Sequence, residues 1–264
     1  MDGVRHTVAG TDGVRIGLLT AGSGPPLLLV HGGAGQIESW EPVWERLSAR
    51  WRVAAMDRRG RGSSGDGHHC SIEDEYGDVA AVARALAETA GCPVDVFGHS
   101  YGATCTIGAA RLSAPFRRIV LYEPPAGETV TPDFVDRLGL LIDEGQSGRA
   151  TVMFLTEVIG LDSDEVDALR AAPPAYDILA VVAATLPREG HALQGLDLPA
   201  VAAGVPLPVH FLLGELSPAW AGVITRSVAE VLPDPEVTIL PGLGHEAIST
   251  APDQVVDHLE RFLA

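Results

Sequence analysis

Short apolar runs alternate with segments of helical periodicity along most of this chain of 264 residues. The run at residues 27–30 is continuously apolar, which is typical of a strand covered on both faces. Further strand-like runs follow at residues 52–57, 94–97, 118–122, 208–214 and 236–240. Between the runs at 52–57 and 94–97, apolar residues recur every three or four positions over residues 72–90, which predicts an amphipathic helix. The alternation predicts an α/β fold with a mostly parallel sheet flanked by helices.

The two ends of the chain extend this pattern. Residues 4–9 and 14–20 are strand-like and flank a turn that contains Asp12-Gly13, which predicts an antiparallel hairpin at the start of the sheet. Helical periodicity returns at residues 219–232 and at 252–263. Both ends therefore belong to the same α/β core.

The alternation stops after Glu123-Pro124-Pro125 and resumes near residue 206. The pattern in between is helical and interrupted, with pieces at residues 133–144, 148–159, 163–171, 176–185 and 191–196. We therefore predict a core domain built from residues 1–125 and 206–264, with an all-helical cap at residues 126–205.

The charge of the chain narrows the range of partners. Acidic residues outnumber basic ones 35 to 18, the formal net charge is −17, and all the basic residues in this count are arginines. Such a surface repels nucleic acid and anionic membranes, so we expect a small, uncharged molecule as the substrate. The N-terminus lacks the apolar core of a signal peptide and no stretch reaches the ~18 apolar residues of a membrane span, which favours a cytoplasmic protein. The oligomeric state stays open.

The cysteines give no sign of a metal site. Cys70, Cys92 and Cys105 share no metal-like spacing and are interpreted as reduced thiols. In His68-His69-Cys70 three adjacent side chains cannot all turn toward one ion, so this stretch is interpreted as a solvated loop. We expect neither a metal nor a cofactor.

Candidate chemistry begins at Ser100. The strand at residues 94–97 runs into Gly98-His99-Ser100-Tyr101-Gly102, and an alanine-rich helical segment follows. A G-x-S-x-G string at a strand-to-helix turn is the setting of an exposed serine nucleophile, but the string alone is common. Serine attacks at neutral pH only when a base takes its proton, and His245, on a glycine-bounded loop after the last strand, is the candidate base.

Four features now stand in a fixed order: His31-Gly32 after the third strand, the pentapeptide around Ser100 after the fifth, the helical segment after the sixth, and Gly244-His245 after the last. In this order the chain resembles the α/β-hydrolase fold superfamily along nearly its whole length. The resemblance implies an eight-stranded, mostly parallel sheet and a Ser–acid–His triad. It also implies an oxyanion hole made by the backbone N–H groups of Gly33 and Tyr101.

The acid of the triad departs from the commonest pattern. Most members of the superfamily carry an aspartate about three residues after the glycine that ends the seventh strand, and here that position holds Ser217. We favour Glu123 as the acid, because a minority of members place it after the sixth strand and Pro124-Pro125 fix the backbone there. Glu215 is the alternative, although it follows its glycine closely.

The remaining candidates have weaker support. We predict that five residues line a pocket over Ser100, although each could instead pack between helices. They are Gly32, Phe134, Met153, Phe154 and Tyr176. His99 is interpreted as packed under the turn, His31 as a brace for the oxyanion loop, and His191 and His210 as structural. The arginines of residues 57–64 lack P-loop spacing and are interpreted as part of a turn that supports the fold.

The resemblance implies a serine hydrolase that acts on a small or medium uncharged ester or lactone through an acyl-enzyme on Ser100. C–C bond hydrolases and cofactor-free haloperoxidase-like enzymes share the same residues and stay open. A non-hydrolytic member, either a biosynthetic cyclase or a ligand-binding receptor, is the alternative from another class. A pure binder requires neither Ser100 nor His245, so their presence favours an enzyme.

Overall fold

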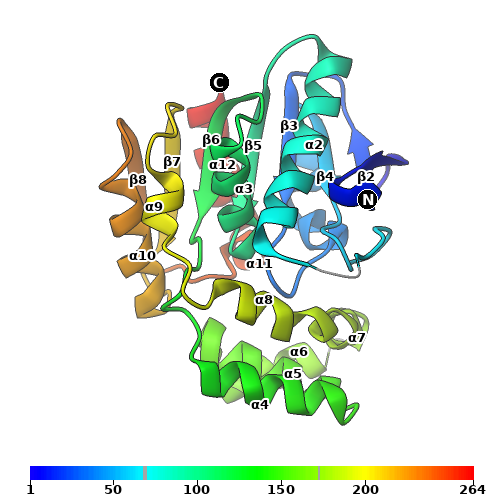
Figure 1. The fold of residues 1–264 in the computed structure, drawn as a ribbon, viewed down its shortest axis with the longest axis vertical. Coiled ribbons are helices and arrows are strands. Elements are labelled where there is room, and N and C mark those ends of the chain that lie inside the picture. The colour runs from blue at the N-terminus through cyan, green and yellow to red at the C-terminus, as the bar shows by residue number, and fades with distance from the viewer. Residues whose placement is uncertain (68–69, 172) are drawn as a thin grey trace.

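An eight-stranded sheet runs through the molecule in the order β1-β2-β4-β3-β5-β6-β7-β8 (Figure 1). The strands are β1 Val4–Ala9, β2 Arg15–Ala21, β3 Pro26–Val30, β4 Arg52–Met56, β5 Val94–His99, β6 Phe116–Tyr122, β7 Val209–Gly214 and β8 Pro235–Leu240. The β1–β2 and β2–β4 pairs are antiparallel, and the other pairs of neighbouring strands are parallel. The computed structural model describes residues 1–67, 70–171 and 173–264, and within them it confirms the predicted fold class.

Strand β3 shows why the sheet is buried on both faces. Leu28 and Val30 belong to one buried apolar cluster, while Leu27 and Leu29 belong to another on the opposite face. The first cluster includes helices α2 (Ile72–Ala90), α3 (Tyr101–Arg111) and α10 (Ala219–Ala229), and the second includes α1 (Glu41–Ser48) and α12 (Pro252–Leu263). A strand between two helical layers has no polar face, which explains the continuous apolar run in the sequence.

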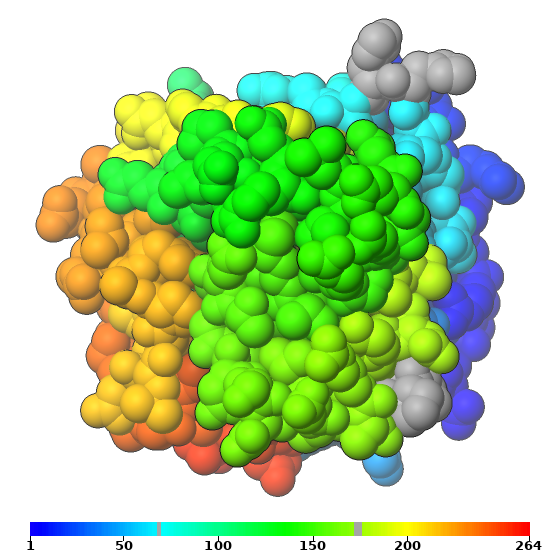
Figure 2. Space-filling model, turned by 90° about the horizontal axis from the view of Figure 1, so that it is seen from below, coloured from blue at the N-terminus to red at the C-terminus, as the bar shows by residue number. Residues whose placement is uncertain are grey.

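A further layer of helices lies across one end of the sheet (Figures 1 and 2). It consists of α4 Pro132–Asp143, α5 Ser147–Phe154 with a π-helical turn at Leu155–Ile159, α6 Ser163–Arg170, α7 Pro173–Val182 with a 3-10 turn at Ala183–Thr185, and α8 Leu186–Leu193. The chain enters this layer from β6, so these helices cover the carboxyl ends of the parallel strands. In α/β folds this end of the sheet carries the ligand sites.

Several short elements escaped the sequence interpretation. They are α9 (Leu198–Ala202), α11 (Ala247–Thr250) and 3-10 turns at Thr11–Gly13 and Ile37–Trp40. Helix α9 falls inside the predicted cap of residues 126–205, yet it packs against α3 and α10 beside the sheet. The last part of the predicted cap therefore lies with the core.

The cysteines that the structure describes are free thiols, with Cys92 exposed, Cys105 buried and Cys70 in between. His68 and His69 lie outside the described residues. None of the described helices is long and apolar enough to cross a bilayer.

Helix α3 approaches β3 closely at Gly102. A β-carbon built on Gly102 would lie 2.2 Å from the carbonyl oxygen of Val30 and 2.4 Å from that of His31. Backbone atoms of a central strand cannot move aside cheaply, so only glycine fits at this point. The second glycine of the pentapeptide is thus required by packing between α3 and β3.

We predict that Gly102→Ala lowers the free energy of unfolding by about 1–3 kcal/mol or more, because the added methyl group overlaps two backbone carbonyls. Gly139→Ala is the matched control, since Gly139 lies inside α4 and its β-carbon would meet nothing within 4 Å. That change should leave stability equal or raise it by up to about 1 kcal/mol. Urea unfolding of both variants measures the difference, and equal stability for the two would contradict the packing described.

Candidate active site

Ser100 occupies a strained turn between β5 and α3. Its backbone has φ 52° and ψ −127°, a combination that a residue with a side chain rarely adopts. The turn is held by the neighbouring strand, because the Ser100 N–H donates a 2.7 Å hydrogen bond to the carbonyl of Tyr122 on β6. This is the geometry expected of the serine turn that the G-x-S-x-G string predicted.

His245 and Glu123 form a buried pair. His245 Nδ1 lies 2.5 Å from Glu123 Oε2, and the two residues are 3% and 0% exposed. Because a carboxylate only accepts, Nδ1 carries the proton and Nε2 is the basic nitrogen. Nε2 is itself buried and has no hydrogen-bond partner among the residues that the structure describes. The imidazole is therefore oriented with one nitrogen left to take up a proton.

The second oxygen of Glu123 is held from strand β7. Oε1 accepts a 2.7 Å hydrogen bond from the Gly214 N–H and a 2.6 Å bond from the Ser217 hydroxyl. Ser217 stands where most members of the superfamily have their aspartate, so at this position a hydroxyl holds the carboxylate that has moved to β6. We had not predicted Ser217 as a site residue. Its polar side chain, at the position where the aspartate usually stands, could have indicated that it contacts the acid.

Glu215, the alternative acid, lies elsewhere. Its side chain is exposed, and Oε2 accepts a 2.7 Å hydrogen bond from the Gly242 N–H. The structure therefore brings Glu123, and not Glu215, to His245.

Other rings enclose His245. The His99 ring lies 4.8 Å from it, centroid to centroid, and His99 Nε2 donates to the His245 carbonyl at 3.1 Å. Trp220 presents its ring at 5.4 Å, and the Tyr122 hydroxyl donates to the Gly244 carbonyl. His99 is thus packed under the turn, as the sequence interpretation expected.

The two neighbouring histidines differ in charge behaviour. Burial works against a charge on His245, but the hydrogen bond and negative charge of Glu123, with a contribution from Glu246, raise its pKa above the ordinary value. Burial lowers the pKa of His99 well below that value, and the proximity of His245 lowers it further. Of these two rings, His245 is the one poised to gain and lose a proton near neutral pH.

A narrow cavity of about 40 Å³ lies over Ser100. Gly33 and Tyr101, the residues predicted for the oxyanion hole, line it together with Ser100. Most of the other lining residues have apolar side chains, and many of these come from α4, α5, α8 and α10. Phe134 and Phe154 are among them, as predicted. This volume is far below the roughly 300–1,000 Å³ typical of small-molecule pockets, so a substrate requires the side chains around the cavity to shift.

Three of the predicted pocket residues do not line this cavity. Met153 receives a 3.6 Å contact at Sδ from the guanidinium of the exposed Arg137. The Tyr176 hydroxyl donates to the Gly148 carbonyl at 2.9 Å and so joins α7 to α5. Gly32 lies against Ser100, where a β-carbon would come within 2.9 Å of the serine Cβ. Periodicity marked the apolar positions of the cap but could not separate pocket walls from contacts between helices.

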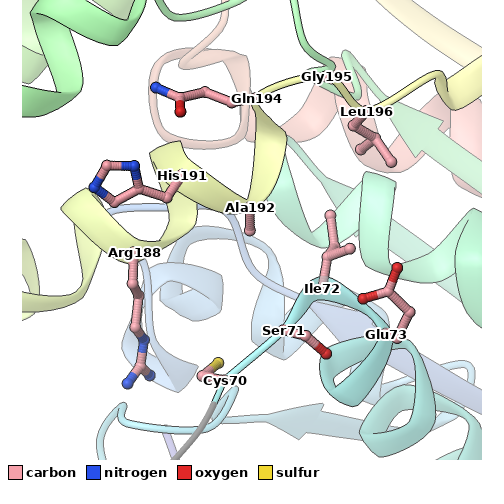
Figure 3. Close-up of a pocket in the computed structure, with 10 residues that line it drawn as sticks. All are labelled: Cys70, Ser71, Ile72, Glu73, Arg188, His191, Ala192, Gln194, Gly195 and Leu196. Carbon is pink, nitrogen blue, oxygen red and sulfur yellow. The ribbon is translucent and has the colours of Figure 1, made fainter.

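A larger hollow of about 490 Å³ opens on the outside of the molecule (Figure 3). It lies between α8 and the start of α2, and Arg188 extends from α8 toward the segment that carries Cys70 (Figure 3). None of the described residues that line it also lines the cavity over Ser100. His191 is exposed at this surface, so the structural role expected for it finds no support.

The arginine-rich turn after β4 is buried and reaches the cap. Arg58 binds Glu75 at 2.6 Å and Glu189 at 2.8 Å, and Arg61 binds Glu189 at 2.6 Å. The Arg58 N–H also donates to His31 Nε2 at 3.0 Å, which braces the loop that carries Gly33. The turn supports the fold as expected, but its link to Glu189 of α8 was not foreseen.

Comparisons with known proteins agree with this geometry. The sequence profile of the alpha/beta hydrolase family matches residues 27–258. The chain belongs to this family. A 2-(acetamidomethylene)succinate hydrolase from Mesorhizobium japonicum is 25% identical over 95% of this chain and 92% of its own, and a pimeloyl-[acyl-carrier protein] methyl ester esterase from Pseudoalteromonas atlantica is 24% identical over 92% and 96%. The crystal structure of an alpha/beta hydrolase from Sphaerobacter thermophilus is 34% identical, with a TM-score of 0.85 over 98% of this chain and all of that one. This chain is accordingly a hydrolase.

We predict that the His245 ring titrates above its ordinary pKa of about 6.5 in the wild-type protein and below it in Glu123→Gln. Burial persists in that variant while the anion that outweighs it is lost. Since the neutral ring is the base, activity that depends on His245 should rise with pH through this raised pKa. NMR titration of the histidine rings measures the shift, and Glu215→Gln, whose side chain bonds Gly242, is the matched control. A fall in the pKa in Glu215→Gln but not in Glu123→Gln would refute the pairing.

Proposed function

We propose that the protein is a serine hydrolase that cleaves a small, uncharged carboxylic ester or lactone through an acyl-enzyme on Ser100. The observation that carries the proposal is the oriented imidazole: Glu123 holds His245 at Nδ1, and Nε2 has no partner among the described residues. Ser100 belongs to the same site, because Trp220 lines the cavity with Ser100 and packs its ring on His245.

In the first half of the reaction the Ser100 oxygen attacks the substrate carbonyl carbon, and His245 Nε2 takes the serine proton. The tetrahedral intermediate carries a negative oxygen, which the N–H groups of Gly33 and Tyr101 stabilise by about 3 kcal/mol each. The bond to the leaving oxygen then breaks, that oxygen takes the proton from His245, and the acyl group stays on Ser100.

In the second half water attacks the acyl carbon and gives its proton to His245. The carboxylic acid leaves when the bond to the Ser100 oxygen breaks and that oxygen takes the proton back. Throughout, Glu123 stays ionised and stabilises the imidazolium that forms twice per turnover. The Ser217 hydroxyl and the Gly214 N–H keep the carboxylate in place.

The walls of the site support an uncharged substrate. Val130, Phe134, Phe154 and Leu186 present apolar side chains to the cavity. A charged group would lose its hydration against these apolar side chains. The methyl ester esterase among the relatives is in keeping with an ester as substrate.

A fluorophosphonate probe tests the proposal directly. We predict that it labels Ser100 in the folded wild-type protein, identified by mass spectrometry of the peptides, and does not label Ser100→Ala or the unfolded wild type. Ser249, exposed on α11, provides the control variant Ser249→Ala, which should label at the wild-type rate. Absence of labelling in the folded wild type, or labelling at another residue, would overturn the proposed function.

A further inference from the structure

A second buried carboxylate stands over the site. Glu189 comes from α8, is 4% exposed, and lines the same cavity as Ser100. Its Oε1 is fully engaged: it accepts from Arg58 at 2.8 Å, from Arg61 at 2.6 Å and from the Thr185 hydroxyl at 3.1 Å. These bonds fix the plane and direction of the carboxylate.

The other oxygen of this carboxylate, Glu189 Oε2, is not engaged. It is buried and has no hydrogen-bond partner among the described residues. It lies beside the backbone of Gly33, where a β-carbon would come within 3.2 Å of it. An unpaired carboxylate oxygen away from water costs free energy unless something in the cavity donates to it. Its position next to the proposed oxyanion hole places that donor close to the scissile carbonyl.

The charges around Glu189 decide what kind of donor fits. Arg58, Arg61, Glu75 and Glu189 are all buried and together carry two positive and two negative charges. A cationic substrate group would leave the cluster with an unbalanced positive charge, and an anionic group would face the free oxygen of Glu189. A neutral O–H or N–H group avoids both costs.

We propose that Glu189 Oε2 accepts a hydrogen bond from a neutral O–H or N–H group on the carbon next to the scissile carbonyl. This inference rests on the proposed function and narrows its substrate to esters of α-hydroxy or α-acylamino acids. Arg58, Arg61 and Thr185 act as positioning residues, because they hold Oε1 and so aim Oε2.

Matched pairs of substrates test the proposal in the wild-type enzyme. The first pair is ethyl lactate and its O-methyl ether, and the second is N-acetylalanine ethyl ester and its N-methyl derivative. In each pair a methyl group replaces the donated hydrogen and the ester is unchanged. We predict that kcat/KM is at least about tenfold higher for the donor in each pair, since its partner leaves the buried acceptor unpaired.

Glu189→Gln gives a sharper test. Arg58 and Arg61 require an acceptor at the Oε1 position, so the amide oxygen must lie there and the NH₂ group must face the cavity. The variant therefore presents a donor where the wild type presents an acceptor. We predict that it loses or reverses the preference, with the methyl ether cleaved at least as well as ethyl lactate.

Glu75→Gln is the matched control, because it removes the same charge from the same cluster without facing the cavity. It should keep the wild-type preference for the donor. Equal kcat/KM within both wild-type pairs, or an unchanged preference in folded Glu189→Gln, would overturn the proposal. Should Glu189→Gln fail to fold, as thermal unfolding would show, the wild-type pairs decide alone.

The fluorophosphonate experiment distinguishes this proposal from the proposed serine hydrolase function on which it rests. Labelling of Ser100 together with equal rates within both pairs would refute the role of Glu189 and leave the serine hydrolase intact. Absence of labelling of Ser100 would overturn both the proposed function and the proposed role of Glu189.

Discussion

The site depends on keeping one carboxylate ionised where water does not reach it. Glu123 is fully buried at the end of β6, and a charge there is tolerated only because donors surround it. Gly214 and Ser217 from the β7 loop hold Oε1, and His245 from the β8 loop holds Oε2. The carboxylate thereby joins the ends of three neighbouring strands. The Ser217 hydroxyl, after β7, donates to the Glu123 carboxylate that follows β6.

The buried ion cluster is the counterpart of this site on the cap side. Arg58 and Arg61 lie on the turn after β4 and form ion pairs with Glu189 on α8, which is 128 or more residues later in the chain. Burial of four charges is costly unless they are mutually paired, and here they balance. The cluster therefore fixes where α8 lies over Ser100. It also leaves Glu189 Oε2 without a partner among the described residues, and the proposed role of Glu189 would link the position of α8 to the choice of substrate.

The pattern of apolar and polar residues along the chain predicted the fold better than it predicted which side chains of the cap line the cavity. Nearby residues predicted the apolar run of β3, the helical period of α2, and the positions of Ser100 and His245. Glu123 followed from its place after β6 and the missing aspartate at Ser217. Helices α9 and α11 are too short to show a period. Glu189 fell between the predicted helical pieces at 176–185 and 191–196, and no local pattern marked it because its partners Arg58 and Arg61 are distant in sequence.

The most direct test of the account is a crystal structure of the protein after a fluorophosphonate probe has reacted. We expect phosphorus bonded to the Ser100 oxygen, one phosphonyl oxygen bound by the N–H groups of Gly33 and Tyr101, and His245 still held by Glu123 at Nδ1. An adduct on another residue, or a Glu123 side chain turned away from His245 in the adduct, would contradict it.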